Sequence, residues 1–153
     1  MTTTQENARP VPLIGPAVGQ AQASLTRLLT GILAGSGTSH QAWLGLQRLA
    51  ALGGQATQEA YLRDLSDWLL LDGPAAARLA DDLVAAGLAD TEGGAMRLTA
   101  QGRGLREQVL AASAKITGPM LAMIDRDDLE TTVRTLDEIT RRARGTITTE
   151  GNR

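Results

Sequence analysis

The chain lacks cysteine and phenylalanine, and its aromatic residues are limited to Trp43, Trp68 and Tyr61. Without cysteine there can be no disulfide, thiol nucleophile or thiolate metal ligand. No apolar run approaches the roughly 18 residues that a membrane span requires. The polar first residues also lack the basic and apolar regions of a signal peptide. We therefore expect a cytoplasmic protein that does not enter a membrane.

Catalytic and metal-binding signatures are also missing. The one histidine, His40, has no acidic or histidine neighbours at a metal-ligand spacing. No nucleophile motif of the Gly-x-Ser-x-Gly type and no glycine-rich phosphate-binding motif occurs. Asp81 and Asp82 are adjacent, and neighbouring helical positions do not face each other, so the two carboxylates do not converge. We predict that the protein is not an enzyme and holds no metal or cofactor.

Leucine and alanine dominate the apolar residues, which make up 42% of the 153 residues. Both are strong helix formers, so the composition favours a mainly α-helical protein. The length is sufficient for a real hydrophobic core. The formal net charge is −2, which is unusual for a protein that binds nucleic acid.

Apolar residues recur every three or four positions near both ends of the chain, which is typical of helices that pack in pairs. This pattern predicts helices over 13–33, 100–124 and 127–144, between a flexible arm at 1–11 and a flexible tail at 145–153. Two interpretations of these helices remain open. They form either a dimer interface or the core of a monomeric bundle.

The middle of the chain, over about 55–99, has the pattern of a winged helix-turn-helix with a two-stranded wing. Asp72 is a good helix cap, and Pro74 suits the first turn of the helix that follows. That helix ends at Gly87, and two short runs about Gly93-Gly94 predict a hairpin. Thr99 is expected to cap the next helix. Leu98 should fill the core beneath the wing, and Gly102 should allow close packing.

Two stretches carry a resemblance to a known family, LADDLVAAGLAD (79–90) and RLTAQGRGLREQV (97–109). Together with the order of the helices they resemble the MarR family of bacterial transcriptional regulators. The resemblance implies one domain over 12–144 that dimerises through its first and last two helices. It also implies that the protein binds double-stranded DNA at a pseudo-palindromic operator, with half-sites about 34–36 Å apart, and is a repressor released by a ligand.

The resemblance places the DNA contacts at the start of the fourth helix and on the wing. The residues implied are Gly73, Pro74, Ala75, Ala77, Arg78 and Arg97. However, residues 72–106 hold four arginines against five acidic residues, and the wing lacks the Asp-x-Arg typical of the family. Phosphate neutralisation supplies much of the affinity for DNA. An alternative is therefore a winged-helix dimer that has lost DNA binding and acts as a protein-interaction or ligand-binding module.

The resemblance also implies a site for a small aromatic or lipophilic ligand where the dimer helices meet the DNA-binding lobe. The candidate residues are His40, Trp43, Gln47, Arg106 and Met120. A blander interpretation stays open for two of them, because Trp43 lies on an apolar face typical of core packing and His40 stands at a helix start.

Overall fold

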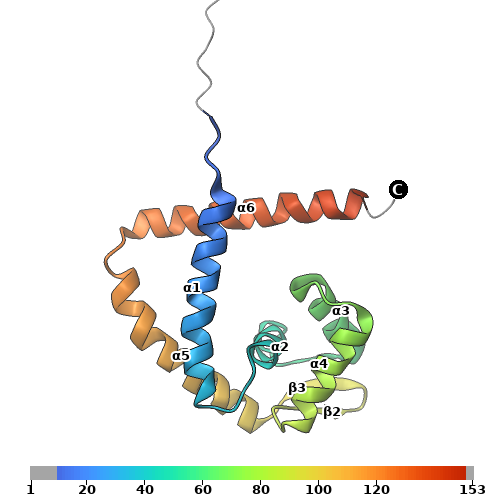
Figure 1. The fold of residues 1–153 in the computed structure, drawn as a ribbon. Coiled ribbons are helices and arrows are strands. Elements are labelled where there is room, and N and C mark those ends of the chain that lie inside the picture. Colours follow the sequence, from blue (N-terminus) through green and yellow to red (C-terminus); the bar gives the residue numbers. More distant parts are fainter. Residues whose placement is uncertain (1–9, 151–153) are drawn as a thin grey trace, which may run out of the picture. The chain divides into compact units, whose positions relative to one another are not determined.

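The computed structural model describes residues 10–150, with side chains up to residue 148. These residues form six helices and three strands (Figure 1). In chain order the elements are α1 (Ile14–Ala34), α2 (His40–Ala51), β1 (Gln55–Thr57), α3 (Gln58–Leu69), α4 (Gly73–Ala85), β2 (Ala89–Glu92), β3 (Ala95–Leu98), α5 (Ala100–Leu121) and α6 (Arg126–Glu150). The chain divides within α5 into two compact units, the first ending at Val109 and the second beginning at Leu110. The single domain over 12–144 stays a prediction from the sequence.

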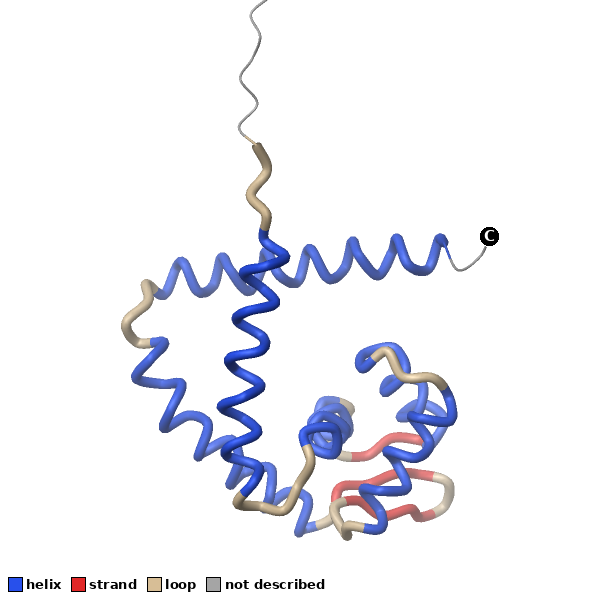
Figure 2. The backbone as a smooth tube through the Cα atoms, in the orientation of Figure 1, coloured by secondary structure: helices blue, strands red, loops and turns tan. Residues whose placement is uncertain are grey.

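The first unit is a winged helix-turn-helix, as the sequence predicts. Its sheet has three antiparallel strands in the order β1-β3-β2, coloured red in Figure 2. The expected hairpin is β2–β3, in which Asp90 lies opposite Arg97. The strand β1 was not predicted; its Gln55 lies opposite Arg97 on the other side of β3. Three residues show too little alternation of apolar and polar side chains to indicate a strand. The strand that pairs with β1 is also distant in the sequence.

The core of this unit lies between α2, α3, α4 and the sheet. Tyr61 is fully buried, and its hydroxyl donates a hydrogen bond to the carbonyl oxygen of Gly45 at 2.8 Å. Trp43 is 4% exposed and belongs to the same core. Trp68, by contrast, is 51% exposed, and the guanidinium carbon of Arg48 lies 4.2 Å from the centre of its ring.

Polar caps fix where the helices of the first unit begin. The side chains of Ser39, Thr57 and Asp72 accept hydrogen bonds from backbone N–H groups in the first turns of α2, α3 and α4. Thr99 does the same for α5 by accepting from the N–H of Gly102 at 3.0 Å. The caps expected at Asp72 and Thr99 are thus confirmed, and they fix where α4 and α5 begin.

The terminal helices differ from the predicted ones at their ends. Pro119 lies within α5, which ends two residues later at Leu121, whereas the sequence had placed the end near residue 124. α6 continues to Glu150, so residues 145–150 are helical although a flexible tail had been expected from residue 145. Residues 1–9 of the arm predicted over 1–11, and the last three residues of the predicted tail, lie outside the described residues.

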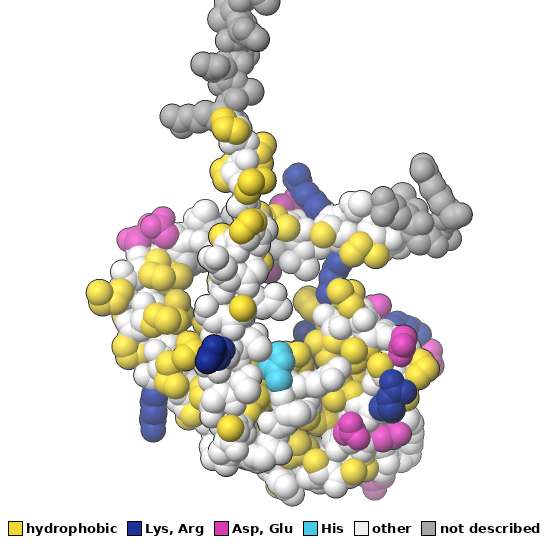
Figure 3. Space-filling view, in the orientation of Figure 1, with side chains coloured by type: hydrophobic (Ala, Val, Ile, Leu, Met, Phe, Trp, Pro, Cys, Tyr) yellow, Lys and Arg dark blue, Asp and Glu magenta, His cyan; other side chains and the backbone are white. Residues whose placement is uncertain are grey.

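Large apolar side chains are exposed on α1 of the first unit and on α6 of the second unit. Leu25 in α1 is 49% exposed, and Val133 in α6 is 58% exposed. Figure 3 shows hydrophobic side chains on the surface of α1. The predicted apolar stripes therefore exist, and in each unit part of their surface is left exposed by that unit's own side chains.

None of the described helices combines the length and the apolar character needed to cross a membrane. Across the described residues, no three histidine or acidic side chains gather closely enough to hold a metal ion.

Candidate nucleic-acid interface

The start of α4 presents its backbone and small side chains at the surface. Gly73, Pro74 and Arg78 are exposed, while Ala75 and Ala77 are half-buried. The Asp72 carboxylate accepts from the N–H of Ala75 at 2.7 Å, which uses one of the free N–H groups of the first turn. These five positions of α4 were predicted to contact DNA, and the side chain or backbone of each is at least partly exposed.

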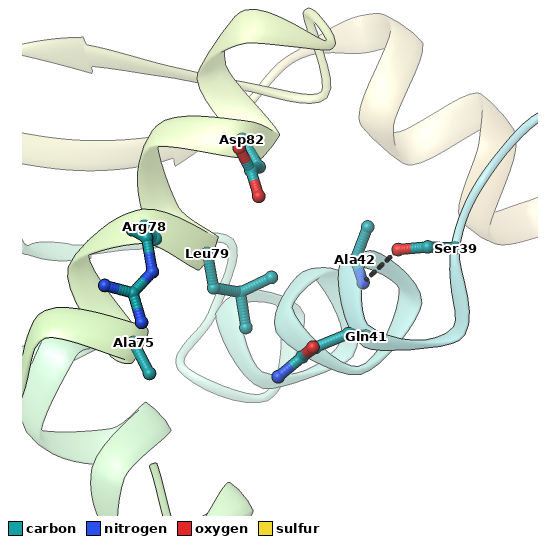
Figure 4. A pocket seen from close by; sticks show the side chains of 7 residues that line it. All are labelled: Ser39, Gln41, Ala42, Ala75, Arg78, Leu79 and Asp82. Atoms are coloured by element: carbon teal, nitrogen blue, oxygen red, sulfur yellow. Dashed lines mark hydrogen bonds between the residues drawn. The ribbon is translucent and has the colours of Figure 1, made fainter. Parts of the chain in front are cut away.

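A groove separates this part of α4 from the start of α2 (Figure 4). It has a volume of about 220 Å³, and Leu79 and Ala42 form its apolar wall. Its polar side chains are Ser39, Gln41, Arg78 and Asp82. Sequence reasoning had not linked Ser39 or Gln41 to this surface, because they lie about forty residues from α4. Only the packing of α2 against α4 brings them together.

The rest of the exposed face of α4 is acidic. Asp81 and Asp82 are both exposed, and neither forms an ion pair among the residues that the structure describes. Arg78 is the only cation of the helix. A DNA phosphate near the second turn of α4 would therefore meet two carboxylates and one guanidinium.

Arg97 of the wing is held by two carboxylates. Its Nε donates to Asp90 at 3.0 Å, and a terminal nitrogen forms an ion pair with Glu92. The hydrogen bond that Arg97 donates to the Asp90 carboxylate is the main cause that raises the pKa of Arg97 above its usual value. The Arg97 side chain is 37% exposed, so solvent can reach it, but its charge is compensated within the hairpin.

The structure brings together two of the five residues proposed to bind a small ligand. Arg106 Nε donates to Gln47 Oε1 at 2.6 Å, which joins α5 to α2. His40, Trp43 and Gln47 are spaced along α2, where His40 and Gln47 are half-buried and Trp43 is buried. Met120 belongs to the second unit and is 43% exposed.

No family model and no curated protein matches the chain. Similar folds occur among solved structures. NadR in complex with 4-hydroxyphenylacetate is 20% identical, over 92% of this chain and 98% of that one, with a TM-score of 0.69. The organohalide-sensing regulator RdhR in its 2,4-dichlorophenol-bound form is 17% identical, over 94% and 90%, with a TM-score of 0.68. A MarR family protein from Bacillus stearothermophilus is 19% identical, over 85% and 92%, with a TM-score of 0.67.

These similarities cover almost the whole of this chain and of each similar protein. At this level of identity they establish the fold and not the activity. The chain therefore has the winged helix-turn-helix fold of MarR-family regulators, which the sequence resemblance had predicted.

Proposed function

We propose that this protein is a MarR-family transcriptional regulator that binds double-stranded DNA as a homodimer and responds to a small ligand. The observation that carries the proposal is the exposed start of α4 on a winged helix whose fold is shared with such regulators. Gly73, Pro74, Ala75 and Ala77 would approach the base edges, where alanine methyl groups can contact thymine methyls. Arg78 supplies the charged contact, and Arg97 a further one once it leaves its carboxylate partners.

The exposed apolar stripes support the dimer. In α6, Val133, Leu136 and Ile139 are 58%, 38% and 37% exposed. Monomeric proteins seldom leave such a contiguous apolar surface in water, since its burial against a second copy is favourable. A two-fold dimer would place two α4 helices against successive half-sites of an operator, as repression at a pseudo-palindromic site requires.

The ligand response rests on the contact between Gln47 and Arg106 and on the position of Trp43 one turn away on α2. NadR and RdhR have been solved with 4-hydroxyphenylacetate and 2,4-dichlorophenol respectively, both aromatic. We infer that the site around His40, Gln47 and Arg106 accepts an aromatic or lipophilic compound in this chain too, while a role for Met120, which belongs to the second unit, stays a prediction from the sequence. Its guanidinium and amide would fix a polar group of that compound.

One specific observation favours a second candidate, a winged-helix dimer that has lost DNA binding and binds proteins or ligands instead. Both surfaces that should face DNA carry acidic groups, Asp81 and Asp82 on α4 and the Asp90–Glu92 pair around Arg97. Since neutralised phosphates set the salt dependence of binding, a reading surface of this charge has little electrostatic affinity to offer.

DNA binding separates the two candidates. Binding to the DNA that flanks the protein's own gene should be measured as a function of salt. An Arg78→Ala variant should bind about tenfold more weakly, since arginine contacts in a groove typically contribute about 1–3 kcal/mol. Arg126→Ala, which removes an exposed arginine of α6 paired with Glu130, is the matched control. Absence of binding at low salt on every fragment would favour the second candidate.

Dimerisation is tested by sedimentation velocity. A Val133→Glu substitution in the apolar stripe should shift the protein toward the monomer, because it places a charge where the second copy packs. Thr132→Glu adds the same charge at the neighbouring exposed position, off the stripe, and should leave the dimer intact. A wild-type protein that sediments as a monomer would contradict the proposed assembly.

The ligand response is tested by tryptophan fluorescence. In a Trp68→Phe background Trp43 is the only remaining indole, so its emission reports on α2 alone. An aromatic acid or a chlorinated phenol that binds near Gln47 and Arg106 should quench this emission and weaken DNA binding. An emission spectrum that stays unchanged across such a panel would count against the proposed site.

A further inference from the structure

A second groove lies at the base of the wing, and of the residues proposed to contact DNA it includes Arg97 but none of those on α4. It consists of two adjoining hollows of about 490 and 230 Å³. Gly53, Gly54, Leu98 and Arg103 line both hollows, so they form one continuous surface within the first unit. The groove runs from the β2–β3 hairpin past the turn after α2 to the second turn of α5. Its size is within the range of small-molecule sites.

Arginines gather along this groove although the protein is acidic overall. Arg97 lines one hollow, Arg106 the other, and Arg103 both. Asp90 and Glu107 are the carboxylates of the lining, and Asp90 is already paired with Arg97. The groove therefore keeps an excess of positive charge that its own side chains do not compensate.

Arg103 and Arg106 are held in place without being neutralised. Arg103 donates from Nη1 to the carbonyl oxygen of Leu98 at 2.8 Å. Arg106 donates from Nε to the neutral amide of Gln47 at 2.6 Å. Neither forms an ion pair with any side chain that the structure describes. A guanidinium that is fixed by one neutral acceptor keeps its full charge and has further N–H donors for a ligand. Its side chain is already ordered before a ligand binds, so binding costs less rotamer entropy.

Arg103 and Arg106 line the same hollow, where both can take part in binding one anion. Arg103 and Arg106 are three positions apart on α5, so they are neighbours on one helix face. A phosphomonoester carries about −1.5 to −2 charges at neutral pH and three acceptor oxygens, whereas a carboxylate carries one charge and two. Leu98 and Ala50 add an apolar surface for a small carbon body.

We propose that this groove binds a small phosphorylated molecule, with its phosphate held by Arg103 and Arg106. The site is separate from the α4 surface and from the aromatic site proposed around Trp43, apart from the shared Arg106. It does not depend on DNA binding, so it can be tested without DNA. Glu107 is the one unpaired carboxylate of the groove and opposes the anion.

The test is titration calorimetry at constant ionic strength with phenyl phosphate, ribose 5-phosphate, inorganic phosphate and benzoate. The wild type should bind both phosphomonoesters, and Arg103→Gln should weaken that binding about tenfold, the usual effect of losing a hydrogen bond to a charged group. Arg27→Gln, which removes an exposed arginine of α1 that forms no ion pair with the described residues, is the control and should leave binding unchanged. Glu107→Gln should strengthen it.

Three results would overturn the proposal. The first is no binding of either phosphomonoester at millimolar concentration, and the second is equal loss in the Arg103→Gln and Arg27→Gln variants. The third is an Arg103→Gln variant that loses benzoate binding as much as phenyl phosphate binding, which would show that the groove does not select phosphate. Inorganic phosphate binding as tightly as the esters would identify the free ion as the source and keep the phosphate site. Circular dichroism should first confirm that each variant is folded.

Discussion

A Cβ atom placed on Gly102 would lie 2.1 Å from the carbonyl oxygen of Leu88. The first turn of α5 thus packs against the backbone that leads into β2, and only glycine fits there. Gly102→Ala should destabilise the protein by about 3 kcal/mol, because the contact is with backbone that cannot rotate away. Gly104→Ala is the matched control, since nothing lies within 4 Å of its added methyl group. It should stabilise α5 by about 0.5–1 kcal/mol. Urea denaturation of both variants checks the contrast.

The ion pair between Arg48 and Asp64 should matter more than any exposed pair of the first unit. Two hydrogen bonds of 2.8 Å join the side chains, which are 22% and 11% exposed. Arg48→Ala leaves the Asp64 carboxylate without its ion-pair partner at a position that solvent hardly reaches. It also removes the stacking of the guanidinium on the Trp68 ring. We expect a loss of about 2 kcal/mol, less than for a fully buried pair. Arg63→Ala breaks the exposed pair with Glu59 and should cost less than about 0.5 kcal/mol. Equal losses in the two variants would contradict this ranking.

The Tyr61 hydroxyl makes the stability sensitive to alkaline pH. Burial, aided by the negative charge of Asp64, raises the pKa of Tyr61 above its ordinary value of 10.0. The unfolded chain loses its tyrosine proton first, so the stability that this group provides is complete below about pH 10 and falls as the pH rises further. Tyr61→Phe should cost about 1 kcal/mol at neutral pH through the lost hydrogen bond to Gly45. That cost should shrink above pH 10, as urea titrations at several pH values would show.

The sequence predicts those features of the fold that depend on a single residue and its neighbours in the chain. Asp72 and Thr99 cap their helices, and Gly102 allows a close contact, as their positions in the chain had indicated. Features that depend on distant pairing were not predictable. The three residues of β1 become a strand only because β3 pairs with them, and the carboxylate partners of Arg97 follow from the hairpin register.

The same division applies to the candidate sites. The positions on α4 follow from one helical pattern, so the sequence suffices to select them. The grooves do not follow from such a pattern, because Ser39 and Arg78 line one groove and Gln47 reaches Arg106 only after α2 has packed within the unit. A sequence pattern consists of residue types and their spacing, and these two pairs have neither a fixed spacing nor an unusual residue type.

The carboxylates around Arg97 should limit DNA binding if the proposed function is right. Glu92→Gln removes one partner of the guanidinium, which then has a free charge for a phosphate oxygen. We expect the affinity for operator DNA to rise about fivefold, the upper range for an exposed ion pair, with a steeper salt dependence. Part of any gain could come from the lost negative charge alone, so Glu92→Gln should also be made in an Arg97→Ala background. If Arg97 contacts DNA, most of the gain disappears there. An equal gain in both backgrounds would show that Arg97 remains on the hairpin and that only the charge of Glu92 matters.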